Sequence, residues 1–348
     1  MENAKIRVLI VDDSAVVRKM LAEIIGRDPQ IEVVGTAVDP YMARDQILAL
    51  KPDVVTLDLE MPRMDGITFL KILMQHHPVR IVVMSSLTAN GSVKALEALT
   101  AGALEVMSKP ENPAALTVMG DQLILKIKAA AMAQAKPTRG VTQVAPVRSL
   151  YNPQQLILMG ASTGGTDALQ KVLKHLPQQI PGICIVQHIP AFFSKAFADR
   201  LNSLCKIEVR EAVDGDHVKP GLALLAPGGR HMTLRWQLTH YVVTLKDGPV
   251  VWHQRPSVDV LFSSAANYNA SGMISVLLTG MGRDGAVGMA RLKEAGATNF
   301  AQSEEDCVVY GMPRSAIEMG VVDEVLTLDA MPDAILSRAN VIRRNLQH

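Results

Sequence analysis

Short apolar runs alternate with helical patterns along most of the chain, and this alternation constrains the fold more than any other feature of the sequence. In the first third of the chain the apolar runs have the length of buried strands. These expected strands are Ile6–Val11, Glu32–Ala37, Val54–Asp58, Ile81–Met84 and Glu105–Met107. The expected helices between them are Val16–Gly26, Ala43–Leu50, Gly66–Gln75 and Ser92–Thr100. Strands that alternate with helices form βαβ crossovers, so we expect a parallel sheet covered by helices.

The same alternation returns after residue 150, with one interruption. The apolar run Leu156–Met159 is followed by a turn of small residues and then by a helical pattern. Gly182–Val186 and Ile274–Leu278 are expected strands of the same kind. The stretch Gly221–Trp252 instead alternates apolar and polar residues and contains Asp247-Gly248, a hairpin signal. We therefore expect a three-layer α/β/α domain with a mainly parallel sheet and a β-hairpin insertion.

The two regions are joined by a segment without sustained periodicity. Residues 136–149, KPTRGVTQVAPVRS, contain two prolines, one glycine and scattered polar residues, as semi-rigid linkers do. We place a first domain at 1–125, a linker with a helical start at 126–150, and a second domain at 151–345. A chain of 348 residues, 48% of them hydrophobic, is long enough to build two cores.

Charge and cysteine content exclude several classes of protein. The 35 basic and 34 acidic side chains are interspersed and give a net charge of +1, so nothing indicates binding to nucleic acid or insertion into a membrane. The three cysteines lack CxxC spacing, which indicates free thiols rather than a disulfide framework or a zinc site. The N-terminal residues lack the pattern of a signal peptide or a membrane span. We expect a cytoplasmic protein.

Polar side chains cluster at the expected strand ends of the first domain. Asp12 and Asp13 follow the first strand, Asp58 ends the third, Ser85 ends the fourth and Lys109 follows the fifth. The carboxyl ends of parallel strands share one edge of a sheet, where ligands bind. Three carboxylates at one edge repel each other unless a hard cation such as Mg²⁺ joins them. One strand-end aspartate is commonly only a turn residue, but five polar residues on matching strands favour a site for a metal and an anion.

Three runs of the first domain, VLIVDDS, DVVTLDLEMPRMDG and ALEVMSKP, resemble response-regulator receiver domains. The resemblance implies a flavodoxin-like (βα)5 fold in which Asp58 accepts a phosphoryl group from a histidine kinase. It also implies that Mg²⁺ is held by Asp12, Asp13, Asp58 and the backbone carbonyl of Glu60.

The same resemblance places Ser85 and Lys109 against the phosphoryl oxygens, and it suggests a cis bond between Lys109 and Pro110. Receivers often carry an aromatic switch residue three positions before the lysine, where this chain has Val106. Rotation of an aromatic ring is therefore not expected to carry the signal here.

The second domain holds a candidate nucleophile. Residues 160–164, Gly-Ala-Ser-Thr-Gly, fit G-x-S-x-G, a sharp strand-to-helix turn that exposes a serine, here Ser162. His188 follows another expected strand, and Asp284 lies in the glycine-rich loop after a third. A serine needs a base to remove its proton, and a histidine base needs a carboxylate to fix its tautomer. The order Ser–His–Asp differs from the Ser–Asp–His order of α/β-hydrolases, which argues against that fold.

Alternatives to this interpretation remain open at this point. A turn of small residues is also typical of phosphate-binding loops, although this one lacks the Gly-Lys-Ser/Thr end of a P-loop. Asp284 alone fits a loop or helix-capping residue. The chain also contains other histidines that spacing cannot exclude as the base, namely His175, His217, His231 and His253.

Six runs of the second domain resemble the catalytic domain of chemotaxis protein-glutamate methylesterases: GASTGGT, VQH, LAPGGRHM, RPSVDVLF, LLTGMGRDGA and CVVYGMPRSAI. The resemblance implies a triad of Ser162, His188 and Asp284, and it places three further residues near the site, in the pocket and around the oxyanion. These are Thr163, Gly164 and Met281.

That family hydrolyses glutamate γ-methyl esters on chemoreceptor cytoplasmic helices and deamidates receptor glutamines, with no cofactor for the esterase chemistry and a chemotaxis histidine kinase as phosphodonor. Two other functions stay open from the sequence. One is a non-enzymatic response regulator whose second domain binds partners. The other is a receiver-controlled amidase or esterase with a different substrate.

Overall fold

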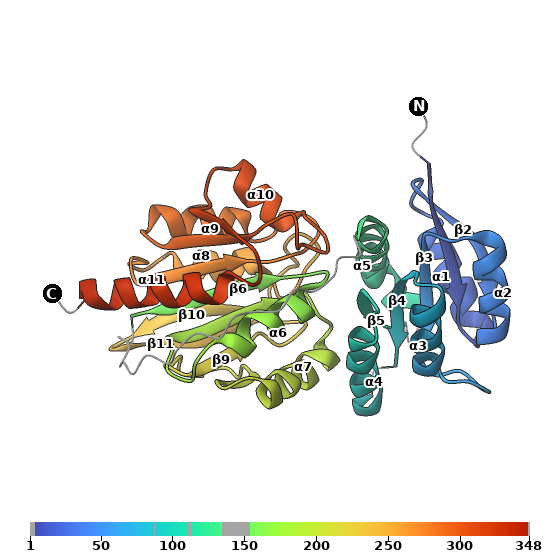
Figure 1. The fold of residues 1–348 in the computed structure, drawn as a ribbon, viewed down its shortest axis with the longest axis horizontal. Coiled ribbons are helices and arrows are strands. Elements are labelled where there is room, and N and C mark those ends of the chain that lie inside the picture. Colours follow the sequence, from blue (N-terminus) through green and yellow to red (C-terminus); the bar gives the residue numbers. More distant parts are fainter. Residues whose placement is uncertain (1–3, 87, 110–112, 134–153, 347–348) are drawn as a thin grey trace. The chain divides into compact units, whose positions relative to one another are not determined.

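The computed structural model describes residues 4–86, 88–109, 113–133 and 154–346 of the chain (Figure 1). The chain divides into two compact units, Met1–Ala133 and Gln134–His348. The expected linker at 136–149 and the Lys109-Pro110 bond lie outside the described residues. Within the described ranges, no helix is both long and apolar enough to cross a membrane.

The N-terminal unit is a parallel sheet with strand order β2-β1-β3-β4-β5, the flavodoxin-like order, as predicted. Right-handed crossovers place α1 and α5 on one face and α2, α3 and α4 on the other. Helix α5 continues to Met132, beyond residue 125, where the sequence placed the end of the first domain. The elements are β1 (Ile6–Val11), α1 (Ala15–Ile25), β2 (Ile31–Ala37), α2 (Pro40–Leu50), β3 (Val54–Asp58), α3 (Gly66–His76), β4 (Arg80–Ser85), α4 (Ala89–Thr100), β5 (Glu105–Ser108) and α5 (Pro113–Met132).

Capping residues set where the helices of this unit begin. Ser14, Asp39, Asp65 and Thr88 each precede a helix in an extended conformation and accept a hydrogen bond from a backbone N–H of its first turn. Such caps satisfy N–H groups that have no partner inside the helix. The N–H of Ser14 also donates to Asp12 Oδ1 at 2.9 Å, so the start of α1 fixes a residue of the strand-end cluster.

The C-terminal unit is a seven-stranded parallel sheet with strand order β14-β13-β12-β6-β7-β9-β8. From β6 the chain first builds toward β7 and then returns to add β12 on the other side. The strand order therefore reverses between β6 and β12, and such a switch point is where open parallel sheets bind ligands. The strands are β6 (Leu156–Ala161), β7 (Gly182–Gln187), β8 (Glu208–Glu211), β9 (Leu222–Leu225), β12 (Met273–Leu277), β13 (Thr298–Gln302) and β14 (Glu324–Leu326).

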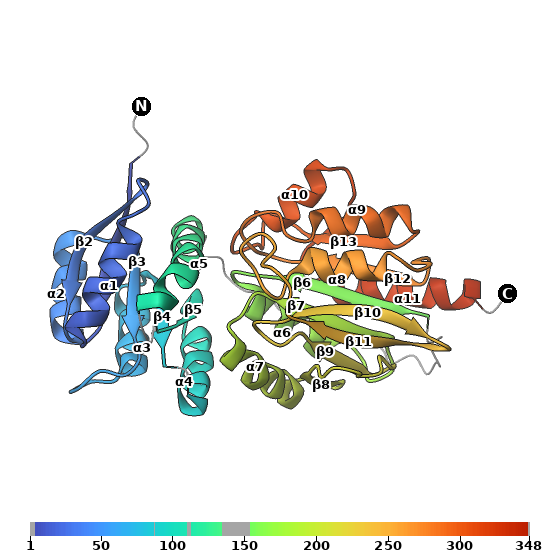
Figure 2. The same cartoon turned by 180° about the vertical axis from the view of Figure 1, so that it is seen from behind.

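Helices cover both faces of this sheet, and an antiparallel hairpin packs beside them (Figure 2). Helices α6, α7 and α11 form one layer, and α8, α9 and α10 form the other. The hairpin packs its apolar face against α8 within the main core. The predicted three-layer architecture with a hairpin insertion is thus confirmed. The remaining elements are α6 (Gly165–His175), α7 (Ala191–Leu204), β10 (His231–Gln237), β11 (His240–Lys246), α8 (Val258–Ala265), α9 (Ala286–Glu294), α10 (Met312–Glu318) and α11 (Met331–Leu346).

The hairpin turn lies elsewhere than the sequence indicated. β10 and β11 pair from His231↔Lys246 to Gln237↔His240, so the turn is Leu238-Thr239 and Asp247-Gly248 only follows the second strand. Leu238 adopts a left-handed conformation (φ 55°) that normally favours glycine or asparagine. The register is set instead by alternate apolar side chains of both strands that are buried in the core, because a slip by one residue would turn them to solvent.

Candidate functional site

The predicted triad residues follow three neighbouring strands at the switch point of the C-terminal sheet. Ser162 follows β6, His188 follows β7, and Asp284 lies in the loop between β12 and α9. The residues before the first two, Ala161 and Gln187, are register partners, and the His188 N–H donates to the Ala161 carbonyl at 3.1 Å. Residues far apart in sequence are therefore brought to one edge by strand pairing alone.

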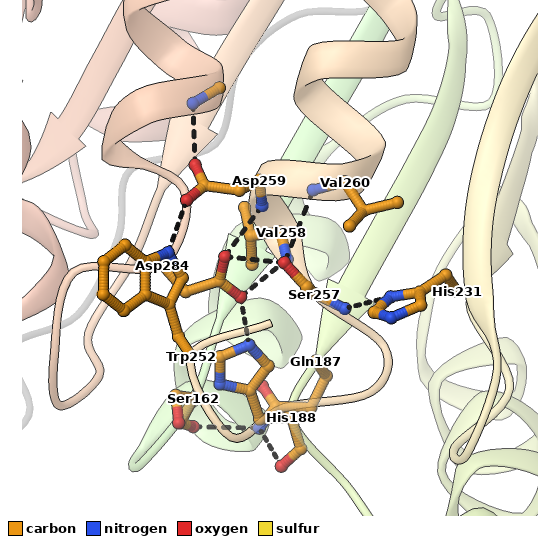
Figure 3. Close-up of polar contacts among 11 residues, drawn as sticks. Ser162, Gln187, His188, His231, Trp252, Ser257, Val258, Asp259, Val260 and Asp284 are labelled. Carbon is orange, nitrogen blue, oxygen red and sulfur yellow. Dashed lines mark hydrogen bonds and ion pairs between the residues drawn. The ribbon is translucent and has the colours of Figure 1, made fainter. Parts of the chain in front are cut away.

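His188 and Asp284 form a buried hydrogen-bonded pair. His188 Nε2 lies 2.8 Å from Asp284 Oδ2, and each side chain is only 2% exposed. The other ring nitrogen, Nδ1, is buried and has no hydrogen-bond partner among the described residues. In Figure 3 the imidazole lies between Asp284 and Ser162, with Nδ1 on the side of the serine. A carboxylate only accepts, so Nε2 carries the proton and Nδ1 keeps a basic lone pair.

Four donors fix the Asp284 carboxylate. Besides His188 Nε2, it accepts from Ser257 Oγ (2.8 Å) and from the N–H groups of Val258 (2.8 Å) and Asp259 (2.9 Å) at the start of α8. Burial raises the pKa of Asp284, but these hydrogen bonds, that from His188 first, outweigh burial and lower it. Asp284 therefore stays ionised, and it holds the imidazole in one orientation.

Two glycines let the chain turn tightly around Ser162. Gly164 has a φ of 76°, and α6 begins directly after it, so the positive end of a helix lies beside the serine. A Cβ on Gly280 would lie 2.6 Å from Ser162 Cβ, so only glycine lets the loop after β12 approach this closely. Ser162 donates its own N–H to the Thr279 carbonyl (2.9 Å), which removes that N–H from the potential oxyanion donors.

The three residues predicted near the site belong to the two loops that meet at the serine. Thr163 is buried, and its carbonyl accepts from Thr279 Oγ1 at 2.9 Å. Gly164 is the N-cap of α6. Met281 is partly exposed and follows Gly280, whose carbonyl accepts from two N–H groups at the start of α10. No described residue accepts the Met281 N–H, which leaves it available to a ligand.

Sequence reasoning did not predict which residues donate to Asp284. Ser257 Oγ donates to that carboxylate, while its own N–H donates to His231 Nδ1 (3.2 Å). His231 Nε2 in turn bonds the Pro249 carbonyl (2.9 Å), so this histidine holds the loop in front of α8 and is not the base. Asp259 accepts from Trp252 Nε1 at 2.8 Å. The run RPSVDVLF was the available signal: the resemblance predicts that Arg255-Pro256-Ser257-Val258-Asp259 shapes the pocket, but the sequence did not give the exact role of its members.

Two other candidate histidines make contacts elsewhere in the unit. His175 bonds the Lys171 carbonyl within α6, and His217 packs against the ring of His240. Within the described ranges, His188 is the histidine that contacts Asp284.

The strand-end cluster of the N-terminal unit also comes together. Lys109 Nζ lies 2.7 Å from Asp58 Oδ2 and 3.2 Å from Asp12 Oδ2. Asp12, Asp13 and Asp58 each offer a carboxylate oxygen, and these oxygens lie within 4.8 Å of one another. Hard oxygen donors at this spacing fit Mg²⁺, and the cluster is typical of a receiver magnesium site.

Asp58 is the most perturbed carboxylate of that cluster. Burial raises its pKa to about 6, although Lys109 and the Glu60 N–H, which donates to Oδ1 at 2.9 Å, act in the opposite direction. Ser85 Oγ donates to the Gly91 carbonyl (3.0 Å) rather than to Asp58. Val106 is a buried residue of β5 paired with Val83, so it offers no exposed ring to rotate.

Comparison with known proteins shows which families the two units match. Residues 157–335 match the CheB methylesterase family, and residues 8–120 match the response regulator receiver domain. The chain is 51% identical over 339 residues to protein-glutamate methylesterase/protein-glutamine glutaminase 2 of Syntrophus aciditrophicus, covering 96% of this chain and 99% of that protein. It is 49% identical over 340 residues to the protein-glutamate methylesterase/protein-glutamine glutaminase of Methylobacillus flagellatus, covering 95% and 96%.

A solved structure supports the fold of the C-terminal unit. The catalytic domain of the Thermotoga maritima CheB methylesterase is 39% identical, has a TM-score of 0.52, and covers 53% of this chain and 97% of its own. Together with the full-length relatives and the matched receiver domain, this shows that the chain belongs to the CheB methylesterase family.

Proposed function

We propose that this chain is a phosphorylation-activated protein-glutamate methylesterase and protein-glutamine glutaminase of chemotactic adaptation. Its substrates are glutamate γ-methyl esters and certain glutamines on the cytoplasmic helices of chemoreceptors, so it acts in the cytoplasm. The proposal depends above all on the His188–Asp284 pair, whose free Nδ1 faces the side of Ser162. A base held by a buried carboxylate next to a serine is the arrangement required for acyl transfer.

The first half of the reaction transfers the acyl group to the enzyme. His188 Nδ1 accepts the Ser162 hydroxyl proton while Ser162 Oγ forms a bond to the ester carbonyl carbon. Asp284 stabilises the resulting imidazolium through Nε2–H. Collapse of the tetrahedral intermediate breaks the bond to the methoxy oxygen, and His188 returns the proton to it, so that methanol leaves.

In the second half, water takes the place of methanol. His188 accepts a proton from the water as the water oxygen attacks the acyl carbon, and the bond to Ser162 Oγ then breaks with return of the proton. The product is a free glutamate side chain. The same steps on a glutamine release ammonia instead of methanol.

We assign stabilisation of the oxyanion to two backbone segments. These are the turn after Ser162, at the positive end of α6, and the Met281 N–H in the opposing loop. Removal of one such donor typically costs about 3–4 kcal/mol of transition-state stabilisation. Thr163 and Gly164 thus contribute through their backbone rather than through their side chains.

The receiver unit regulates this chemistry through Asp58. Asp12, Asp13, Asp58 and the Glu60 carbonyl would hold Mg²⁺, which neutralises charge during phosphoryl transfer from the chemotaxis kinase. Lys109 already contacts Asp58, whereas Ser85 must exchange its bond to Gly91 for one to the phosphoryl group. Because Val106 occupies the position where receivers often carry an aromatic ring, no ring can rotate on phosphorylation. The exchange of the Ser85 hydrogen bond is then the conformational change that signals phosphorylation.

The test is methanol release from a methylated receptor fragment by the full chain, with and without Mg²⁺ and a small-molecule phosphodonor. Ser162→Ala should reduce the rate by at least about 10³-fold, because the nucleophile is lost. The matched control is Ser203→Ala, an exposed serine of α7 that should behave as wild type. Full methanol release by Ser162→Ala would contradict the assignment.

The regulatory part has its own test. Asp58→Asn should keep the basal rate of methanol release and lose its stimulation by phosphodonor and Mg²⁺, because the phosphoryl acceptor is absent. Stimulation that persists in Asp58→Asn would exclude this carboxylate as the regulatory site.

A further inference from the structure

One cationic side chain next to the triad has no acidic partner among the described residues. Arg283 directly precedes Asp284 in the loop between β12 and α9, with left-handed glycines at 282 (φ 88°) and 285 (φ 97°). Asp284 is buried, whereas Arg283 is exposed. Two consecutive residues of one loop therefore have different environments: Asp284 is a buried carboxylate of the triad, and Arg283 is a solvent-exposed cation beside it.

The guanidinium of Arg283 rests on an aromatic platform. Its Cζ lies 4.8 Å from the ring centroid of Trp252, a cation–π contact. The indole is fixed from behind, because its Nε1 donates to Asp259 Oδ2 at 2.8 Å (Figure 3). The other oxygen of Asp259 accepts from the Gly288 N–H at 2.7 Å, which ties the platform to both α8 and α9. The exposed guanidinium therefore lies over a ring that hydrogen bonds hold in one orientation.

The backbone of Trp252 indicates that this placement is specific. Trp252 has a φ of 52°, and His253 follows with a φ of 61°, both in the left-handed region that bulky side chains rarely adopt. Such conformations persist only where surrounding contacts impose them, and they cluster at ligand sites. The indole is nevertheless 42% exposed, so the strain is not explained by burial of the ring.

In the part of the chain that the structure describes, no acidic side chain forms an ion pair with this cation. Among the described residues Arg283 forms no salt bridge, while Asp284 and Asp259 are already satisfied by other donors. Two other arginines of this unit pair with carboxylates, the half-buried Arg230 with Asp247 and the exposed Arg314 with Glu318. A guanidinium that is held on a ring and has unused donors suits the capture of a carboxylate from outside.

We propose that Arg283, held on Trp252, is a specificity residue that binds an acidic side chain of the substrate helix about one turn from the esterified glutamate. This inference rests on the proposed function, and it adds a charge requirement to the substrate. On a helix, side chains three or four residues apart lie on the same face, so one carboxylate can reach Arg283 while the ester reaches Ser162. A neutral side chain at that position makes a poorer substrate.

The experiment uses the full chain, activated by phosphodonor and Mg²⁺, and two receptor fragments that each carry one methyl ester. In one fragment the residues three and four positions on either side of the ester are glutamate, and in the other they are alanine. The wild type should show a KM about tenfold lower for the acidic fragment, with similar kcat. The reason is that an ion pair formed on binding stabilises the bound substrate and the transition state equally.

Variants at the cation should remove this preference in a graded way. Arg283→Gln should raise KM for the acidic fragment to the value for the neutral one and leave KM for the neutral fragment unchanged. Arg283→Lys should keep part of the preference, since it keeps the charge but not the planar fork. Trp252→Phe should also lose part of it, because the ring remains but its bond to Asp259 does not.

The control is Arg235→Gln, which removes an exposed arginine of β10 that likewise has no salt bridge among the described residues. It should keep the wild-type preference. If Arg283→Gln instead lowered kcat/KM equally for both fragments, or kept the preference, the role of Arg283 would be structural and the proposal wrong. Absence of methanol release from both fragments with the wild type would contradict the esterase assignment itself, and this inference with it.

Discussion

Each unit buries an aspartate at the carboxyl edge of a parallel sheet, yet the pKa values of the two aspartates shift in opposite directions. Asp58 ends β3 and Asp284 lies in the loop after β12, and both are almost inaccessible to solvent. Burial raises the pKa of Asp58 to about 6, whereas hydrogen bonds lower the pKa of Asp284 in spite of burial. Position in the fold therefore does not determine the chemistry of a strand-end carboxylate.

The difference lies in the number and arrangement of donors. Asp284 receives one hydrogen bond from His188, one from Ser257 and two from the start of α8. Asp58 receives one N–H, from Glu60, and shares the Lys109 ammonium with Asp12. A fully satisfied carboxylate is a fixed orienting group, whereas an incompletely satisfied one remains available to a cation and an incoming phosphoryl group.

The largest effect is expected where the orienting carboxylate loses its charge. Asp284→Asn should keep the fold but lower kcat by about 10⁴-fold, because an amide no longer fixes the His188 tautomer or stabilises the imidazolium. Methanol release measures the rate, and circular dichroism checks the fold. Asp247→Asn, an exposed aspartate after the hairpin, is the matched control. If Asp284→Asn retained most of its activity, the claim that ionised Asp284 orients His188 for catalysis would be wrong.

The sequence predicted the positions of this chemistry but not its support. Ser162, His188 and Asp284 could be placed at one edge because strand ends are visible as apolar runs that stop at polar residues. The hydrogen bonds of Ser257 and the cap it makes on α8 depend on how the loop folds back over the sheet. That folding is long-range, and no local pattern specifies it.

The fold could also be predicted from the pattern of apolar runs, but the prediction of one turn was wrong. Both parallel sheets and the hairpin insertion followed from period and length, and the structure confirms them. Asp247-Gly248 had the composition of a hairpin turn, but burial of alternate residues in β10 and β11 placed the turn at Leu238-Thr239. Packing of many side chains outweighed the preference of two residues.

A smaller effect is expected when Asp284 loses one donor and keeps its charge. Ser257→Ala removes the bond to Oδ1 and the side-chain cap of α8, so kcat should fall about tenfold and stability by about 1–2 kcal/mol. Ser264→Ala is the matched control, because this serine of the same helix also makes two hydrogen bonds but none to Asp284. It should lose stability and keep kcat. Equal losses of kcat in both variants would mean that Ser257 does not support catalysis by holding the Asp284 carboxylate in one orientation.

The smallest effect is expected for Asp58, whose raised pKa should make the stability of the receiver unit depend on pH when Mg²⁺ is absent. A carboxylate whose pKa is higher in the folded state makes a contribution to stability that is complete below its unfolded value, near 4, and is lost as pH rises through about 6. The melting temperature of the receiver transition in the wild type should therefore fall relative to Asp58→Asn between about pH 4 and 7, by a few degrees. Differential scanning calorimetry of the full chain measures the melting temperature of the wild type and of Asp58→Asn.

Two additions make this last test specific to the incompletely satisfied carboxylate. Saturating Mg²⁺ should abolish the difference in slope, because the cation stabilises the ionised form of Asp58. Asp28→Asn is the control within the same unit. In the wild type burial raises the pKa of Asp28, but the ion pair with Lys128 outweighs burial and lowers it. The stabilisation by Asp28 is therefore present above about pH 4 and constant between about pH 5 and 7, the upper part of the range tested. A wild-type slope that matched Asp58→Asn without Mg²⁺ would show that Lys109 alone satisfies Asp58, and the contrast between the two aspartates would then be one of geometry rather than of charge.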